Sequence, residues 1–454
     1  MRAGGGGSRL ALAWARVRDS LWFVPGIAVV TGTVLAMLAV QVPTPSTESE
    51  LARIWLFGGG AEGARGVLSA IAGGLITVTG TIFSVTIVAL QLASSQFTPR
   101  LLGSFMADRV NQAVLGIFIG TFTYTLLVLR TIRSAAEDRV ELVPHVGVTI
   151  ALLLLLLSVG ALVLFIDHAA RSIQASVILH RESRRALARV EALFPRRVGE
   201  AADDVGAAGG ADEAAGAPAV VAADAAGYLQ AVHGEALWPL AERGGGPLTV
   251  RMEVHVGAFV FPGKPLAVVW PASRCDAEVA AAVRSAFALG AERTSEQDVE
   301  FGLVELSDIA VRALSPGIND PTTALHCIDR LTEVLAALGT RARPSPWRAS
   351  PDGLVRLRVQ DTDFDRALGI AFDQIRHYGA SNPAVAAKLL ASALDLAAVV
   401  PAARRRSLAE TADAVLRAAR REVDDPPALA RLEALASRVH AAVTGSADLP
   451  HPPR

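Results

Sequence analysis

The residues of this chain that could do chemistry at membrane depth are small or hydroxyl-bearing, and they gather in one apolar segment. Residues 68–100 read LSAIAGGLITVTGTIFSVTIVALQLASSQFTPR, with no charge before Arg100. Helical spacing places one set of these side chains on or beside a common face. The set is Gly73, Thr77, Gly80, Thr81, Ser84 and Gln91. Uncharged hydroxyls can line an ion path without the cost of burying a charge in the membrane.

Two interpretations of this face stay open. In the first, it lines a water-filled pathway in a homo-oligomer, and Thr98, Pro99 and Arg100 form its inner mouth. In the second, the small residues let neighbouring helices approach closely, and the hydroxyls bond to backbone carbonyls. Thr98-Pro99 then ends an ordinary helix, because the residue before a proline disfavours helical geometry. Both interpretations predict more than a plain lipid anchor.

Ionisable groups close another apolar segment, 146–166. Asp167 and His168 follow it directly, and Arg171 comes one turn later. Histidine titrates near neutral pH, so this membrane-edge group could gate a pathway or relay protons. We favour an interfacial ion-pair cluster, because the cost of a charge falls towards the membrane surface.

The sharpest motif of the polar half is SPGINDPTTA, residues 315–324. Its candidate ligand residues are Ser315, Asn319, Asp320 and Thr322, because an exposed helix start can bind an anion. We favour a capped turn, in which Asn319 or Asp320 caps a helix that begins with a proline. The GxxxxGK[ST] pattern of a phosphate loop is missing, so nucleotide binding is not predicted.

Acidic residues are frequent just before this motif, among them Asp298, Glu300 and Glu305. Paired carboxylates can hold a metal or do acid–base chemistry, but no HxxxH or DxDxDG spacing is present. We therefore interpret these acids as the solvated face of a helix. The two cysteines have no CxxC spacing. We predict no catalytic residue, no metal site and no cofactor, and we expect that the protein is not an enzyme.

Composition indicates a membrane part joined to a soluble part. Of 454 residues, 52% are hydrophobic and 19% are charged, and the mean hydropathy is +0.39. The net charge of -1 gives no basic field for nucleic acid. Four apolar segments reach the length of about 20 residues that a helix needs to cross a bilayer. They are 21–40, 67–92, 112–132 and 146–166.

The expected fold class is an α-helical membrane bundle of four transmembrane helices, followed by a cytoplasmic α+β domain with a small strand region and a helical C-terminal part. Alternation predicts strands within 248–270 and 354–359, and helical spacing predicts helices over 276–289, 296–314, 322–338 and 364–442. The expected divisions are a cytoplasmic tail 1–20, a transmembrane domain 21–168, a basic juxtamembrane helix 169–198, a flexible low-complexity linker 199–227, an α+β domain 228–360 and a helical region 361–454.

Arginine placement sets the expected orientation. One side of the membrane receives the N-terminal arginines, the loop with Arg100 and Arg109, and the arginine-rich stretch that starts at Arg171. Because cytoplasmic loops carry the excess of basic residues, we place both chain ends in the cytoplasm. Anionic lipid attracts juxtamembrane arginines, so the bilayer is an expected partner.

Three stretches carry a family resemblance. TIFSVTIVALQLASSQFTPRLL (81–102), FGLVELSDIAVRALSPGINDPTTA (301–324) and FDQIRHYGASNPAV (372–385) resemble a bacterial family of predicted membrane proteins, domain of unknown function 2254. The resemblance implies a multi-pass protein of the bacterial inner membrane and supplies no catalytic residue. The chain departs from it at Asp167-His168, where relatives are expected to have a His pair, which weakens any claim for paired-histidine chemistry.

The sequence thus leaves two functional hypotheses. The first is a homo-oligomeric channel or transport-like protein with a cytoplasmic regulatory domain, whose second span lines the pathway. The second is a membrane-tethered sensor or scaffold whose soluble domain binds a ligand or partner without conduction. Self-association is expected in the first, nucleic acid in neither, and the ion or ligand stays open.

Overall fold

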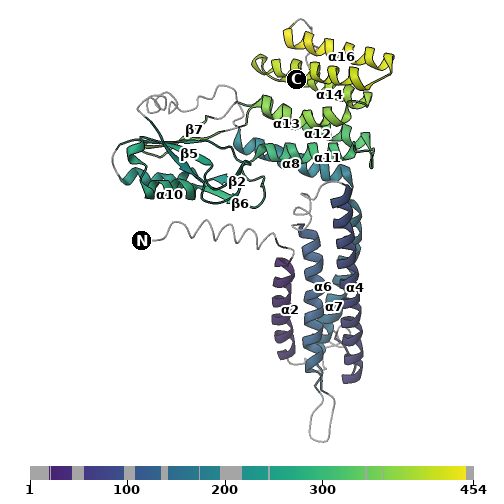
Figure 1. The fold of residues 1–454 in the computed structure, drawn as a ribbon. Coiled ribbons are helices and arrows are strands. Elements are labelled where there is room, and N and C mark those ends of the chain that lie inside the picture. Colours follow the sequence, from purple (N-terminus) through teal and green to yellow (C-terminus); the bar gives the residue numbers. More distant parts are fainter. Residues whose placement is uncertain are drawn as a thin grey trace. The chain divides into compact units, whose positions relative to one another are not determined.

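A computed structural model describes residues 20, 22–42, 56–96, 108–133, 142–172, 174–194, 217–243, 246–342, 345–360 and 362–445 (Figure 1). The chain forms two compact units, Met1–Gln174 and Ala175–Arg454. Four long apolar helices make up the first unit, and small sheets with a helical C-terminal part make up the second. The expected order of four long apolar helices, a region of small sheets and a helical C-terminal part is confirmed.

The four expected spans are confirmed as helices that are long and apolar enough to cross a membrane. They are α2 (Phe23–Gln41), α4 (Ala61–Gln96), α6 (Arg109–Thr131) and α7 (His145–Ser172). Asp108 caps α6, because its carboxylate accepts hydrogen bonds from the Val110 and Asn111 backbone amides. Helix α4 begins six residues before the expected span, so its first two turns include Glu62 and Arg65.

Helix α6 is the centre of this bundle. It contacts α2, α4 and α7, and 56% of its apolar window is buried, against 22% for each of the other three. Its buried side includes Phe118, Tyr124 and Val128. The Tyr124 hydroxyl donates to the Gly147 carbonyl at 2.9 Å, which ties α6 to the first turn of α7.

Glycines let α2 approach α6 closely. A Cβ placed on Gly32 would lie 2.6 Å from the Gly120 carbonyl oxygen, and one on Gly120 would lie 3.0 Å from the Ala28 carbonyl oxygen. Lipid gives no hydrophobic drive between helices, so such close backbone packing is a main source of their association.

The second unit contains two small sheets. The larger has the order β1-β5-β3-β8-β7, antiparallel except for the parallel pair β3–β8, and the smaller has the order β4-β2-β6. The strands are β1 (Ala219–Ala222), β2 (Gly227–Val232), β3 (Leu248–Met252), β4 (Phe259–Val260), β5 (Pro265–Trp270), β6 (Phe287–Gly290), β7 (Trp347–Ala349) and β8 (Val355–Arg358). Helix α10 (Ala277–Ala286) and the 3-10 helix η2 (Gly234–Arg243) complete their core.

The remaining helices pack against one another in layers (Figure 1). They are α8 (Ala175–Leu193), α11 (Val299–Ala313), α12 (Pro321–Gly339), α13 (Phe364–Gly379), α14 (Pro383–Val399), α15 (Arg406–Glu422) and α16 (Pro426–Thr444). Helix α8 packs on α11 and α12, and α14 contacts α12, α15 and α16. The helical layer therefore begins well before residue 361, where the sequence analysis started its helical region.

Two local expectations differ from the structure. The segment 199–227 was expected to be a linker, but its end forms β1, whose Val221 is 1% exposed, and Gly227 begins β2. The helix expected over 276–289 stops at Ala286, and β6 follows. Strands β1 and β6 are each only four residues long. Pairing of β1 with β5 and of β6 with β2 specifies them, rather than a local sequence pattern.

We predict that Gly32→Val destabilises the bundle, because its side chain would meet the Gly120 backbone. Overpacking of this kind costs about 1–3 kcal/mol. Gly26→Val on the same helix is the matched control, since nothing lies within 4 Å of a Cβ there. Thermal unfolding in detergent, followed by circular dichroism, should show a lower midpoint for Gly32→Val only. Equal midpoints would contradict the close contact.

Candidate functional site

The small, hydroxyl-bearing face of α4 points away from the bundle. Gly73, Thr77, Gly80, Thr81, Ser84 and Gln91 are all exposed. The opposite side of the helix, with Ile71, Leu75 and Ile82, is buried. The predicted grouping of the six residues on one side is therefore observed. In the single chain, this face packs on none of the described helices of the bundle.

The threonines of this face bond to their own helix. Thr77 Oγ1 donates to the Gly73 carbonyl at 2.9 Å, and Thr81 Oγ1 donates to the Thr77 carbonyl at 3.1 Å. Each hydroxyl proton is thus satisfied, while the oxygen keeps acceptor capacity towards the outside. A Cβ at Gly73 or Gly80 would meet nothing within 4 Å. The face can therefore accept either another helix or water.

An apolar belt interrupts the face. Ile87 and Val88 are exposed, and Val88 follows Ser84 by four residues, so it lies on the same side, before Gln91. Val85 is exposed as well, and it follows Thr81 by four residues, so it adjoins the Thr81 side of the face. The hydroxyl-bearing stretch thus runs from Gly73 to Ser84, and the bulky side chains of Ile87 and Val88 follow it.

A second polar set lies inside the bundle, and the sequence analysis missed it. Thr121 and Thr125 of α6 and Ser158 of α7 are buried, and Ser158 Oγ donates to Thr121 Oγ1 at 3.3 Å. Asn111 is 3% exposed, and within the described part of the chain its Oδ1 has no hydrogen-bond partner. The Ser158–Thr121 bond joins α6 to α7, and Thr125 Oγ1 donates to the Thr121 carbonyl within α6. The only signal of these residues in the sequence is helical spacing, which core residues share.

The membrane-edge group divides into two pairs. Arg171 Nη2 and Asp167 Oδ1 form an exposed ion pair at 2.8 Å along α7. His168 Nε2 instead lies 3.0 Å from Asp108 Oδ2, at the N-cap of α6. The histidine therefore joins two spans, and Asp108 is the partner that the sequence analysis did not identify. Thr98, Pro99 and Arg100, the predicted inner mouth, lie outside the described residues.

The SPGINDPTTA turn caps a helix. Asp320 accepts a hydrogen bond from the Thr323 backbone amide at 3.1 Å and from its hydroxyl at 2.5 Å. The hydroxyl bond is the main reason why the pKa of Asp320 is below its usual value. Ser315 Oγ donates to the Arg312 carbonyl, and Asn319 has a φ of 49°. The polar atoms of Ser315 and Asp320 are used within the turn, as the favoured interpretation predicted.

The three acids expected on a solvated helix face, Asp298, Glu300 and Glu305, are all buried. The partners of two of them, Asp298 and Glu300, are arginines. The Asp298 and Glu300 side chains are 2% and 4% exposed. Arg293 Nη2 lies 2.7 Å from Asp298 Oδ2, and Arg366 donates two hydrogen bonds to Glu300, at 2.5 and 3.0 Å. Each carboxylate can be buried because an arginine neutralises it. The sequence interpretation was wrong here, since Arg366 lies 66 residues from Glu300.

The pKa values of the two paired acids are shifted in opposite directions. Burial raises the pKa of Asp298, and Arg293 only partly offsets it. Burial also acts to raise the pKa of Glu300, but hydrogen bonds from Arg366 and Thr362 outweigh it and hold that pKa below its usual value. In the described part of the chain, no group of three or more His, Cys, Asp or Glu side chains is arranged to hold a metal ion.

A cavity of about 470 Å³ lies beside these pairs. Trp238, Met252 and Leu357 contribute apolar walls, and His255, Gln297 and Asp298 contribute polar groups. The Gln297 side chain accepts a hydrogen bond from the Val232 amide at 2.9 Å, so it is held in place. The volume and mixed lining fall in the range of small-molecule sites.

Comparison with known proteins gives one matching family and similar proteins from mycobacteria. Residues 18–395 match the profile of a family described as "Predicted membrane protein (DUF2254)". A Mycobacterium bovis protein and a Mycobacterium tuberculosis H37Rv protein are each 34% identical to this chain over an alignment of 462 positions. The alignment covers 96% of this chain and 83% of each relative. Both are described as uncharacterized proteins. No solved structure gives a significant match.

We predict that Arg366→Gln lowers the free energy of unfolding at neutral pH by about 3 kcal/mol, because it leaves the Glu300 carboxylate buried without its partner. The loss should shrink as the pH falls through the lowered pKa of Glu300, since both proteins then hold a neutral acid. Denaturant unfolding of the full chain at several pH values measures it.

The control is Arg406→Gln, which removes an exposed pair with Glu410 and should change little. Adding Glu300→Gln to Arg366→Gln should recover much of the loss. If the loss of unfolding free energy in Arg366→Gln does not depend on pH, the pairing of Arg366 with the Glu300 carboxylate is contradicted.

Proposed function

We propose that this chain, which belongs to the DUF2254 family of predicted membrane proteins, is a homo-oligomeric ion channel or transport-like protein in which α4 lines the pathway. The observation that carries the proposal is the outward face of α4, with its hydroxyls and glycines exposed and its apolar ridge buried. A face of this kind gains little from lipid, since glycine and threonine offer few atoms for contact. Copies of the chain would bring these faces together around an axis.

The chemistry of the face suits ions. Thr77, Thr81 and Ser84 can present oxygen acceptors in place of water, and the face has no charge to bind an ion too tightly. Ile87 and Val88 would form an apolar ring at the end of the hydroxyl-bearing stretch. Such a ring stops conduction by expelling water, and it opens when it widens. We therefore assign the gate of the proposed pathway to this belt.

We also propose that both chain ends lie in the cytoplasm and that the second unit regulates the pathway. The arginine bias supports cytoplasmic chain ends in a bacterial inner membrane. The second unit follows the last span after a short connection, so a change in that unit can be passed to the bundle.

We predict that Val88→Thr increases basal ion flux severalfold, because a hydroxyl in the belt favours water. Val163→Thr on α7 is the matched control, since it adds the same group to an exposed position on another span. Purified full-length protein is reconstituted in liposomes, and K⁺, Na⁺ and Cl⁻ fluxes are measured under varied voltage, tension and pH. Absence of flux in every protein and condition, or equal effects of both variants, would refute the channel.

A second candidate is a sensor or scaffold without conduction, and the cavity of about 470 Å³ favours it. The experiment uses the full chain, because a fragment that starts at residue 228 would lack α8, which packs on α11 and α12.

We predict that a small molecule stabilises the protein in a thermal-shift screen and that Val359→Trp, which fills the cavity, abolishes the shift. Val220→Trp on the exposed side of β1 is the control. A shift that survives Val359→Trp would place the ligand elsewhere.

A further inference from the structure

Helix α8 has one buried and one exposed side. Its buried side includes Ile178, Leu179, Ala186 and Val190, which are 0–3% exposed, and the helix packs on α11 and α12. A Cβ on Gly302 of α11 would lie 2.9 Å from the Ala186 Cβ, so the two helices are in close contact. The orientation of α8 in the second unit is therefore fixed, and with it the direction of its other side.

The exposed side presents arginines in a fixed arrangement. Glu182 has a side chain 2% exposed, and its carboxylate accepts hydrogen bonds from Arg185 Nη1 at 3.0 and 3.2 Å. Arg181 Nε lies 3.5 Å from the same carboxylate. One buried acid thus positions two arginines. Two positive charges against one negative leave a net charge of +1, and the exposed Arg184 raises it to +2.

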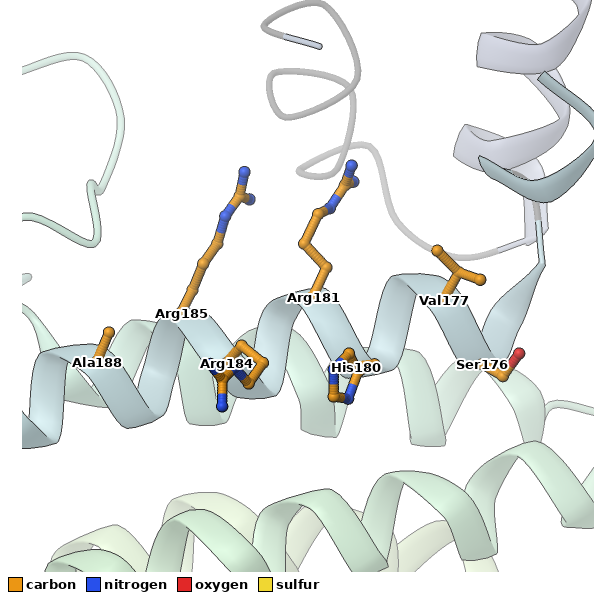
Figure 2. A pocket seen from close by; sticks show the side chains of 7 residues that line it. All are labelled: Ser176, Val177, His180, Arg181, Arg184, Arg185 and Ala188. Carbon is orange, nitrogen blue, oxygen red and sulfur yellow. The ribbon is translucent and has the colours of Figure 1, made fainter. Parts of the chain in front are cut away.

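These side chains border a shallow hollow of about 660 Å³. Figure 2 shows Arg181 and Arg185 reaching out from one side of α8, one turn apart, with Arg184 and His180 on an adjacent side. Val177 lies one turn before Arg181, and Ala188 comes after Arg185, so short apolar groups flank the arginines. The walls of the hollow are almost entirely apolar atoms, and the guanidinium groups stand at its rim.

The chain connection keeps the start of α8 near the end of a membrane span. Only residues 173–174 separate the end of α7 at Ser172 from the start of α8 at Ala175. Three Cα–Cα steps span at most about 11 Å. Ala175, the first residue of α8, is therefore held within that reach of Ser172, whatever the angle between the helices.

We propose that this surface of α8 binds the phosphate headgroup of an anionic phospholipid. Guanidinium groups match phosphate in geometry and charge, and Val177 and Ala188 can contact the glycerol and upper acyl carbons. The whole chain has a net charge of -1, so the attraction is local to this surface. The site tethers the second unit to the bilayer and senses its lipid composition. It does not depend on conduction, so a failed flux experiment leaves it standing.

The test measures lipid binding to the full-length protein in neutral detergent by native mass spectrometry. Dioctanoyl phosphatidylglycerol is compared with dioctanoyl phosphatidylcholine. The main variant is Arg181→Gln, Glu182→Gln, Arg184→Gln and Arg185→Gln together, since leaving Glu182 without its arginines would bury a charge. Each arginine near anionic lipid contributes roughly fivefold in affinity. The net loss of two charges should therefore weaken phosphatidylglycerol binding roughly twenty-fivefold.

The matched control is Arg417→Gln with Arg431→Gln, which removes the same net charge from exposed positions on α15 and α16. It should bind phosphatidylglycerol as the natural chain does. Arg184→Gln alone leaves Glu182 and its two partners in place, and it should still lose roughly fivefold. The proposal is overturned if both lipids bind equally or if the control loses as much as the main variant.

Discussion

The central position of α6 determines what the other spans can present. Because α6 contacts α2, α4 and α7, each of those helices must turn one side inward. In α4 the inward side is the ridge of Ile71, Leu75 and Ile82, which fills the space beside α6. The side with Thr77, Gly80 and Ser84 is then forced outward. The outward hydroxyls are thus a consequence of packing elsewhere in the bundle.

The second unit depends on a comparable constraint at the start of α11. Asp298 caps that helix and is also paired with Arg293, and Glu300 is paired with Arg366 of α13. Gly257, with a φ of +87°, completes this packing, because a Cβ there would lie 2.2 Å from Asp298 Oδ2. Asp298 therefore joins the strand region to the helical layer, and it lines the cavity next to Trp238 and Gln297.

The spans and the polar face of α4 could be predicted because the bilayer imposes them locally. A crossing helix needs about 20 apolar residues, and helical spacing shows which residues share a side. The partners of charged groups could not be predicted in this way. His168 meets Asp108 across 60 residues, and Glu300 meets Arg366 across 66. Nor could the place of α6 be foreseen, since Thr121 and Thr125 look in the sequence much like Thr77 and Thr81. Which pair turns inward is decided by neighbouring helices.

The length of α4 has a consequence for how the protein meets different bilayers. Its 36 residues extend about 54 Å at 1.5 Å per residue, while a hydrocarbon core is about 30 Å thick. The excess must be absorbed by tilt or by turns that stand in the headgroup region. The charged first turns, with Glu62 and Arg65, suit the second outcome at one end. Membrane thickness therefore sets how much of the hydroxyl-bearing face lies within hydrocarbon, and a change in thickness acts on α4 directly.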